Sequence, residues 1–186
     1  MTDLGNPNAT LDRPPMELLA DRIDYETLSD FRKSAFRTMQ QLERLRDWVD
    51  GPEASGARRG LALWVLGRHK DAVPELQKEA NNPVVANCLA RSLCELGRLD
   101  EAEKVLTQAG SDPHQAATML EILDRRGDPD KLLAALEKNA GVLTPADAAY
   151  YRGRAHEQRF EAEAAIAAYD DALRHDPTHT QALFRL

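Results

Sequence analysis

The sequence predicts an all-α fold built from helical hairpins, and two observations support this prediction. Alanine, leucine, arginine, glutamate and aspartate dominate the composition, whereas aromatic residues make up only 5%. This balance favours helix almost throughout the chain. In addition, residues 146–177 read as two amphipathic helices joined by a short turn, with small residues where the two helices would touch.

The spacing of a few residues in this stretch is specific enough to suggest a family. The positions concerned are Gly153, Ala165, Tyr169, Ala172 and Pro177. Their spacing resembles the tetratricopeptide repeat (TPR), a helix–turn–helix unit of about 34 residues. The small residues are needed because the helix axes of such a hairpin approach to about 8–10 Å. The resemblance implies a right-handed superhelical solenoid of TPR-like hairpins.

The N-terminal part precedes the repeats. At 186 residues the chain is long enough for one domain with a continuous core. Residues 1–14 lack periodicity and are expected to be a disordered leader. Residues 15–51 should form one or two helices, a short one from Pro15 and a longer one from about Glu26 or Asp30 to Asp50.

The longer helix allows two interpretations. Several of its apolar residues fit a heptad seam interrupted by Thr38, which would suit self-association or a partner helix. Further apolar residues widen the stripe beyond such a seam, which favours packing against the first repeat. The residues expected to cover that repeat are Phe31, Phe36, Met39 and Trp48.

Residues 52–177 are predicted to form four hairpins, at about 53–81, 83–110, 113–141 and 145–175. Gly67, Gly97 and Gly127 recur at equal intervals after predicted helix ends, where a left-handed backbone is often required. Capping residues followed by proline mark helix starts. These pairs are Asn82-Pro83, Asp112-Pro113, Asp128-Pro129 and Thr144-Pro145.

Two hairpins depart from the family pattern. In the third, Leu132 stands where alanine is expected and Asn139 replaces a second small residue, so its helices are splayed or the repeat is degenerate. In the fourth, Phe160 stands where the turn glycine would lie, so its turn is expected to differ. Residues 178–186 read as the start of a further repeat or as a truncated cap.

Charge and composition argue against several classes of function. The net charge is −7, with 24 basic and 31 acidic residues spread along the length, so no nucleic-acid partner is expected. The longest apolar run, residues 61–66, is too short to span a membrane. Cys88 and Cys94 are expected to be small core residues in a reducing, cytoplasmic location.

No catalytic constellation is recognised, so the protein is not expected to be an enzyme or to need a cofactor or metal. His175 and His179 are separated by Pro177 and should be exposed turn histidines. The family resemblance implies instead a concave groove that binds a partner. The lysine–asparagine set with which some family members clamp the carboxylate of chaperones is missing, since Ala57 and Leu61 stand at its first positions.

The resemblance places six partner-binding residues in that groove: Trp64, Asn87, Arg91, Arg125, Tyr150 and Arg154. They predict a scaffold that binds a protein or peptide ligand with an apolar anchor and mixed charges, with Arg91 and Arg154 both facing water. One alternative is a regulatory or targeting part of a longer protein, followed by an enzyme, secretion or transcription domain. Another is a self-assembly module that uses the 26–50 helix or an exposed C-terminal end.

Overall fold

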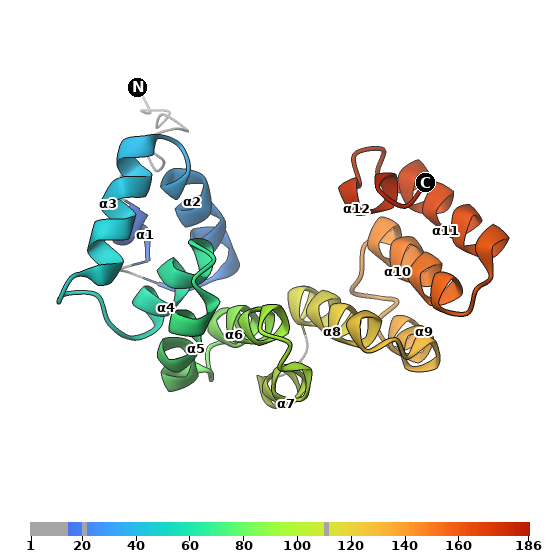
Figure 1. Cartoon of the computed structure of the whole chain (residues 1–186), viewed down its shortest axis with the longest axis horizontal. Helices are drawn as coiled ribbons and strands as arrows, with labels where there is room; N and C mark the ends of the chain where they lie inside the picture. Colours follow the sequence, from blue (N-terminus) through green and yellow to red (C-terminus); the bar gives the residue numbers. More distant parts are fainter. Residues whose placement is uncertain (1–14, 20–21, 110–111) are drawn as a thin grey trace, which may run out of the picture. The chain divides into compact units, whose positions relative to one another are not determined.

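The computed structural model describes residues 15–19, 22–109 and 112–186, and every regular element in this part of the chain is a helix (Figure 1). The all-α prediction is therefore confirmed. The chain divides into two compact units, Met1–Ala109 and Gly110–Leu186, although its length suggested one domain. The leader predicted for residues 1–14 lies outside the described residues. No helix among the described residues is both long and apolar enough to cross a membrane.

The first unit consists of N-terminal helices followed by two helical hairpins. The N-terminal helices are α1 (Pro15–Leu18), α2 (Tyr25–Ala35) and α3 (Met39–Asp50). The hairpins are α4 (Gly56–Val65) with α5 (His69–Leu76), and α6 (Pro83–Glu95) with α7 (Leu99–Ala109). A short 3₁₀ turn, η2 (Gln77–Glu79), extends α5. Both hairpins fall where the sequence predicted them.

Residues 26–50 do not form one helix, so that prediction is wrong. The first helix ends at Ala35, and Thr38 starts the next one as its N-cap. The Thr38 hydroxyl accepts a hydrogen bond of 3.1 Å from the Gln41 backbone N–H, which satisfies a donor that a helix start otherwise leaves unpaired. The heptad seam on which the self-assembly alternative depended is therefore broken at Thr38.

The N-terminal helices contribute apolar side chains to the core of the first unit. Phe31, Leu45 and Val49 are fully buried, because they lie on the inner faces of α2 and α3. By contrast, Phe36 and Met39 are 57% and 66% exposed. Phe36 and Met39 therefore do not belong to a buried stripe, whereas Phe31 is buried as that prediction requires.

Side-chain donors fasten the N-terminal helices to the hairpins. Arg58 Nη2 donates to the Met16 carbonyl (2.7 Å) and Arg59 Nε to the Val49 carbonyl (2.9 Å). Asn82 Nδ2 donates to the Ile23 carbonyl (3.1 Å). Each bond supplies a partner to a backbone carbonyl outside regular helix pairing.

The second unit contains two more hairpins and a short last helix. They are α8 (Pro113–Arg126) with α9 (Pro129–Lys138), α10 (Pro145–Gln158) with α11 (Ala162–His175), and α12 (Thr180–Leu183). The helix starts predicted from capping residue and proline are confirmed in both units. The side chains of Asn82, Asp112, Asp128 and Thr144 each accept from a backbone N–H in the first turn of their helix.

The turns within the hairpins share a left-handed residue. Gly67, Gly97 and Gly127 have φ of 72°, 72° and 70°, as predicted. Phe160 has φ of 62° at the matching place. The N–H after it, that of Glu161, donates to the His156 carbonyl (3.0 Å), as Arg98 does to Leu93 (2.8 Å). The prediction that the fourth turn differs is therefore wrong, because a phenylalanine here adopts the conformation that glycine adopts elsewhere.

The α10–α11 hairpin is the most closely packed pair of helices (Figure 1). Ala165 and Ala172 are buried at its crossing, with Gly153 against the Tyr169 ring. The third hairpin differs, since α9 packs more extensively on α10 than on α8 and Leu132 is fully buried. This arrangement favours splayed helices as the interpretation of the irregular third repeat.

Both cysteines lie in the core of α6, as predicted. Cys88 and Cys94 are each 1% exposed and are not disulfide-bonded. Burial raises the pKa of Cys88 to about 12, because an apolar surrounding disfavours the thiolate. This thiol is therefore not poised for nucleophilic chemistry.

Candidate functional site

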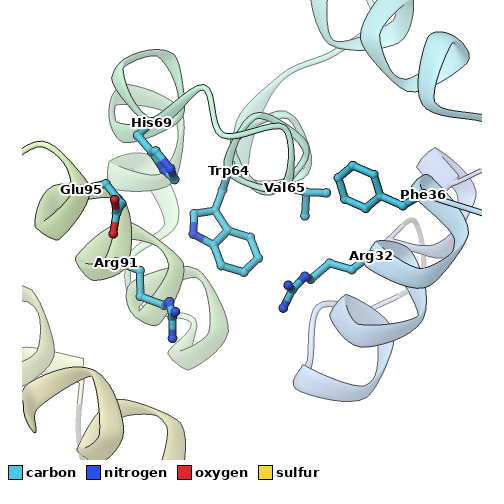
Figure 2. A pocket seen from close by; sticks show the side chains of 7 residues that line it. All are labelled: Arg32, Phe36, Trp64, Val65, His69, Arg91 and Glu95. Carbon is cyan, nitrogen blue, oxygen red and sulfur yellow. The ribbon is translucent and has the colours of Figure 1, made fainter. Parts of the chain in front are cut away.

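A surface hollow in the first unit, here called the Trp64 pocket, brings together side chains from α2, α4, α5 and α6 (Figure 2). Its volume is about 230 Å³. The lining residues are Arg32, Phe36, Trp64, Val65, His69, Arg91 and Glu95. Two of them, Trp64 and Arg91, belong to the groove predicted from the sequence.

The helices explain why these side chains point into the hollow. Leu61, Ala62 and Leu63 of α4 are fully buried, whereas the next residue, Trp64, is partly exposed. Arg91 and Glu95 are four residues apart on α6 and therefore share one face. The floor consequently has an indole from one hairpin and two charged side chains from the other.

Arg32 closes one side of the pocket. Its guanidinium carbon lies 5.4 Å from the centroid of the Trp64 ring, within the range of a cation–π interaction. In Figure 2 the indole lies between the side chains of Arg32 and Arg91. Opposite them, His69 Nδ1 is 3.3 Å from Ser92 Oγ, which restrains the imidazole at the start of α5.

The pocket carries positive charge that its own unit does not neutralise. Among the described residues, neither Arg32 nor Arg91 forms an ion pair, and both are exposed. Other arginines of the unit are paired, for example Arg59 with Glu75 at 2.9 Å. Two unpaired guanidinium groups beside one indole can donate to an anion from outside the protein.

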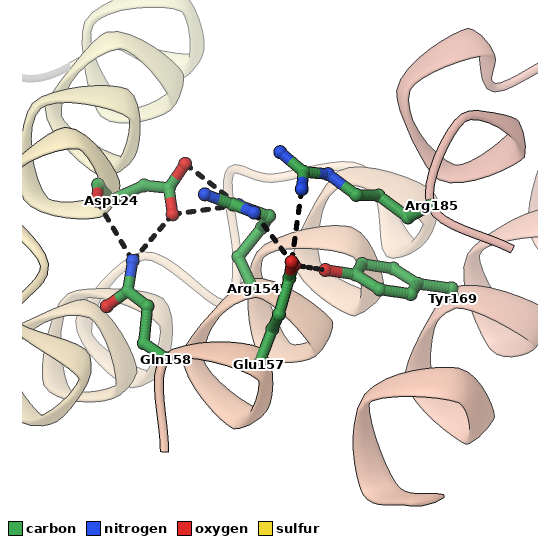
Figure 3. A network of polar contacts seen from close by, with 6 residues as sticks. All are labelled: Asp124, Arg154, Glu157, Gln158, Tyr169 and Arg185. Carbon is green, nitrogen blue, oxygen red and sulfur yellow. Dashed lines mark hydrogen bonds and ion pairs between the residues drawn. The ribbon is translucent and has the colours of Figure 1, made fainter. Parts of the chain in front are cut away.

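The second unit holds a polar cluster of a different kind, here called the Arg154 network (Figure 3). Arg154 donates from Nε to Asp124 Oδ1 (2.9 Å) and from Nη1 to Glu157 Oε2 (2.7 Å). Tyr169 Oη donates to Glu157 Oε2 (2.6 Å), and Arg185 Nη1 to Glu157 Oε1 (3.1 Å). The network therefore links α8, α10, α11 and the segment after α12.

The electrostatics of this network are balanced internally. Burial alone would lower the pKa of Arg154, but the hydrogen bonds and charge of Asp124 outweigh it and raise that pKa. Burial alone would raise the pKa of Glu157, but the Tyr169 hydrogen bond and the charge of Arg154 outweigh this effect and lower that pKa. Each charge thus has a partner within the protein, so we assign the network to structure.

The other predicted groove residues have structural surroundings. Asn87 and Tyr150 are each only 6% exposed. Arg154 has a side chain that is 16% exposed and doubly paired, so the prediction that it faces water is wrong. Arg125 is exposed and pairs with Glu121 at 2.7 Å.

Five pocket residues were not among the six predicted partner-binding residues: Arg32, Phe36, Val65, His69 and Glu95. The groove positions came from repeat numbering, which does not extend to α2 and does not include the start of α5. The available sequence signal for this pocket was Phe36, the aromatic residue at the end of α2. The apolar pattern instead predicted that Phe36 belongs to a stripe buried against the first repeat.

His179 also differs from expectation, whereas His175, the last residue of α11, is exposed as predicted. His179 is 8% exposed and not a free turn residue. Its Nδ1 accepts from the Ala182 N–H (3.2 Å), and its Nε2 lies 3.3 Å from Asp147 Oδ1. Within the described part of the chain, no three histidine, cysteine or acidic residues are grouped so that they could hold a metal ion.

The comparisons with known proteins leave the function to be argued from this geometry. The chain matches no model of a known protein family, and no curated protein is significantly similar to it in sequence.

Proposed function

We propose that the protein is a non-catalytic scaffold that binds a peptide or helix of a partner protein, and that the Trp64 pocket is the docking site. The observation that supports this most strongly is the gathering of two aromatic rings, Trp64 and Phe36, around one hollow with two arginines that form no ion pair with the described residues. Tryptophan and arginine dominate binding energy at protein interfaces, because they bury a large area and make directed hydrogen bonds.

The size of the hollow supports a peptide over a small metabolite. Its volume of about 230 Å³ is below the range of roughly 300–1,000 Å³ typical of small-molecule sites. It suits one or two side chains that project from a larger ligand. A peptide or helix with one apolar anchor fits this description.

The proposal includes a right-handed TPR-like solenoid as the framework of the hairpins. It is supported by the left-handed glycines that follow helix ends and by close helix contacts at small residues. A β-carbon on Gly60, for example, would stand 2.8 Å from Leu76 Cγ. We also propose a cytoplasmic location, which suits two buried cysteines that are not disulfide-bonded.

The proposal is tested by selecting binders from a displayed library of random peptides, with the full chain as bait. Binding is then measured by isothermal titration calorimetry, and tryptophan fluorescence in a Trp48→Phe background, where Trp64 is the remaining tryptophan, reports contact with the pocket. We expect selected peptides to shift this emission, and Trp64→Ala to weaken their binding about tenfold or more.

The matched control is Phe160→Ala, which removes an aromatic side chain that is 95% exposed in the other unit. It should leave affinity unchanged. Failure to enrich any peptide, or equal binding to Trp64→Ala with unchanged circular dichroism, would refute the proposed site.

A further inference from the structure

The geometry points to the chemistry of the partner segment: it carries a single carboxylate side chain, Asp or Glu, next to an apolar side chain. The carboxylate is held between Arg32 and Arg91, while the apolar side chain packs on Trp64 and Phe36. This inference rests on the proposed function, because it names the ligand class of the same pocket.

The first argument is charge complementarity. Neighbouring arginines of the first unit are neutralised within it, namely Arg59 by Glu75, Arg68 by Asp50 and Arg98 by Glu101. Arg32 and Arg91 have no such partner among the described residues. A guanidinium presents a planar set of donors that matches a carboxylate, so an external acid supplies what this pocket lacks.

The second argument is that both arginines line the same hollow beside Trp64, although they come from distant parts of the sequence. Arg32 is on α2 and Arg91 on α6, and Figure 2 shows their side chains on either side of the indole. The buried Cys88 thiol lies within the influence of both. Burial raises its pKa, and the charges of Arg91 and Arg32 each oppose that rise.

The third argument concerns organisation before binding. The cation–π contact with Trp64 holds the Arg32 guanidinium near the pocket, so less side-chain freedom is lost when a ligand arrives. Arg91 projects from the middle of a regular helix whose neighbouring residues, Ala90 and Ser92, are fully buried. Both donors are therefore carried by rigid elements.

The apolar and acidic neighbours limit the ligand further. Phe36 is 57% exposed at the pocket edge and, with Val65, extends the apolar surface beside the indole. Glu95 lines the same hollow and would repel a run of acids. Together with a chain net charge of −7, this disfavours polyanions such as nucleic acid. A ligand with one acidic residue beside one apolar residue complements both the arginines and the apolar surface of the pocket.

The test uses three pools of hexapeptides with acetylated and amidated ends, so that no terminal carboxylate competes. All pools contain a central Leu or Phe followed by one fixed residue, which is Glu, Gln or Lys, and the other positions are randomised among uncharged residues. Affinity for the full chain is measured by isothermal titration calorimetry. We expect the Glu pool to bind at least fivefold more tightly than the Gln pool, and the Lys pool to bind most weakly.

The arginines are then tested directly. In Arg32→Gln and Arg91→Gln the preference for Glu over Gln should fall, and in the double variant it should drop below twofold. Arg91→Lys, which keeps the charge but not the planar donors, should retain part of it. The control Arg46→Gln removes an exposed arginine of α3 outside the pocket and should leave the preference unchanged. Because Arg32 and Arg91 form no ion pairs with the described residues, circular dichroism should be unaltered.

The outcomes separate the two levels of the proposal. Equal binding of the Glu and Gln pools, lost in Trp64→Ala, would overturn the carboxylate inference and leave the peptide-binding site standing. No binding by any pool and no effect of Trp64→Ala would overturn both. Tighter binding of a single-stranded oligonucleotide that depends on the same arginines would replace the acidic peptide as the ligand.

Discussion

The ring of Tyr169 lies directly on the backbone of Gly153, so closely that no side chain fits between α10 and α11. A β-carbon at Gly153 would stand 2.5 Å from Cε1 and 2.6 Å from Cδ1 of Tyr169. The ring cannot easily retreat, because Tyr150 packs against it with centroids 5.9 Å apart and its hydroxyl donates to Glu157. This contact fixes the distance between the two helices.

Gly153→Ala should therefore destabilise the protein although alanine is the better helix former. Overpacking typically costs about 1–3 kcal/mol, which exceeds the gain in helix propensity of about 1 kcal/mol or less. Urea unfolding followed by circular dichroism measures the change. In Gly153→Ala combined with Tyr169→Leu the two effects should not add, since the smaller side chain leaves room for the methyl group. Strict additivity would contradict the contact.

Phe160→Gly should stabilise the fourth hairpin. Phe160 has φ of 62° and is 95% exposed, so its side chain gains little from packing while its backbone is strained. A left-handed conformation costs a non-glycine residue about 1–2 kcal/mol, which the glycine variant would recover. Ordering a glycine, which is more flexible in the unfolded chain, offsets about 0.5–1 kcal/mol of this gain. We expect a net gain of about 0.5–1 kcal/mol in the free energy of unfolding.

The matched control lies in the equivalent turn of the second hairpin. Gly97 has φ of 72° and open space around its missing β-carbon, so Gly97→Ala tests conformation without a steric clash. It should destabilise by about 1 kcal/mol. Equal melting temperatures for wild type and both variants would show that these turns are not strained.

The features that the sequence predicted correctly are local ones. The cap at Asp112 and the left-handed turn at Gly97 depend on backbone groups within one helical turn, so the residue types alone specify them. Thr38 starts a helix without a following proline, and the apolar residues on both sides of it hid the break. Phe160 was misjudged because tertiary packing of α10 on α11 overrides the preference of a single residue.

The candidate site was only half predictable for a similar reason. Trp64 and Arg91 occupy positions that repeat numbering assigns to a groove, whereas Arg32 reaches the indole from a helix that precedes the repeats. No spacing rule connects residues so far apart in the sequence. The burial of Tyr150 and the pairing of Arg154 likewise depend on partners from other helices.

Asn82 should contribute to stability in two separable ways. Its Oδ1 accepts from the N–H of Val84 and Val85 at the start of α6, and its Nδ2 donates to the Ile23 carbonyl before α2. Asn82→Asp keeps the cap and loses the donor, so it should cost less than Asn82→Ala, which loses both. We expect about 1–2 kcal/mol for the alanine variant. Equal losses in urea unfolding would assign the whole effect to the tie with Ile23.

The last prediction concerns the acid response of the Arg154 network. Burial acts to raise the pKa of Glu157, but the Tyr169 hydrogen bond and the charges of Arg154 and Arg185 outweigh it and hold that pKa below its ordinary value of 4.5. A carboxylate whose pKa is lowered by folding adds stability that is fully present above its unfolded pKa. This stability is lost as the pH falls through the folded pKa.

Tyr169→Phe removes the donor to Glu157 and keeps the ring against Gly153, so it should lower the free energy of unfolding by about 1 kcal/mol at pH 7. The difference from wild type should shrink as the pH falls below 4.5 and Glu157 becomes protonated in both proteins. Urea unfolding at a series of pH values between 7 and roughly 3 measures it. The control Tyr151→Phe removes a hydroxyl outside the network and should show a difference that does not vary with pH. A pH-independent loss in Tyr169→Phe would mean that its hydroxyl stabilises the fold without favouring the ionised form of Glu157.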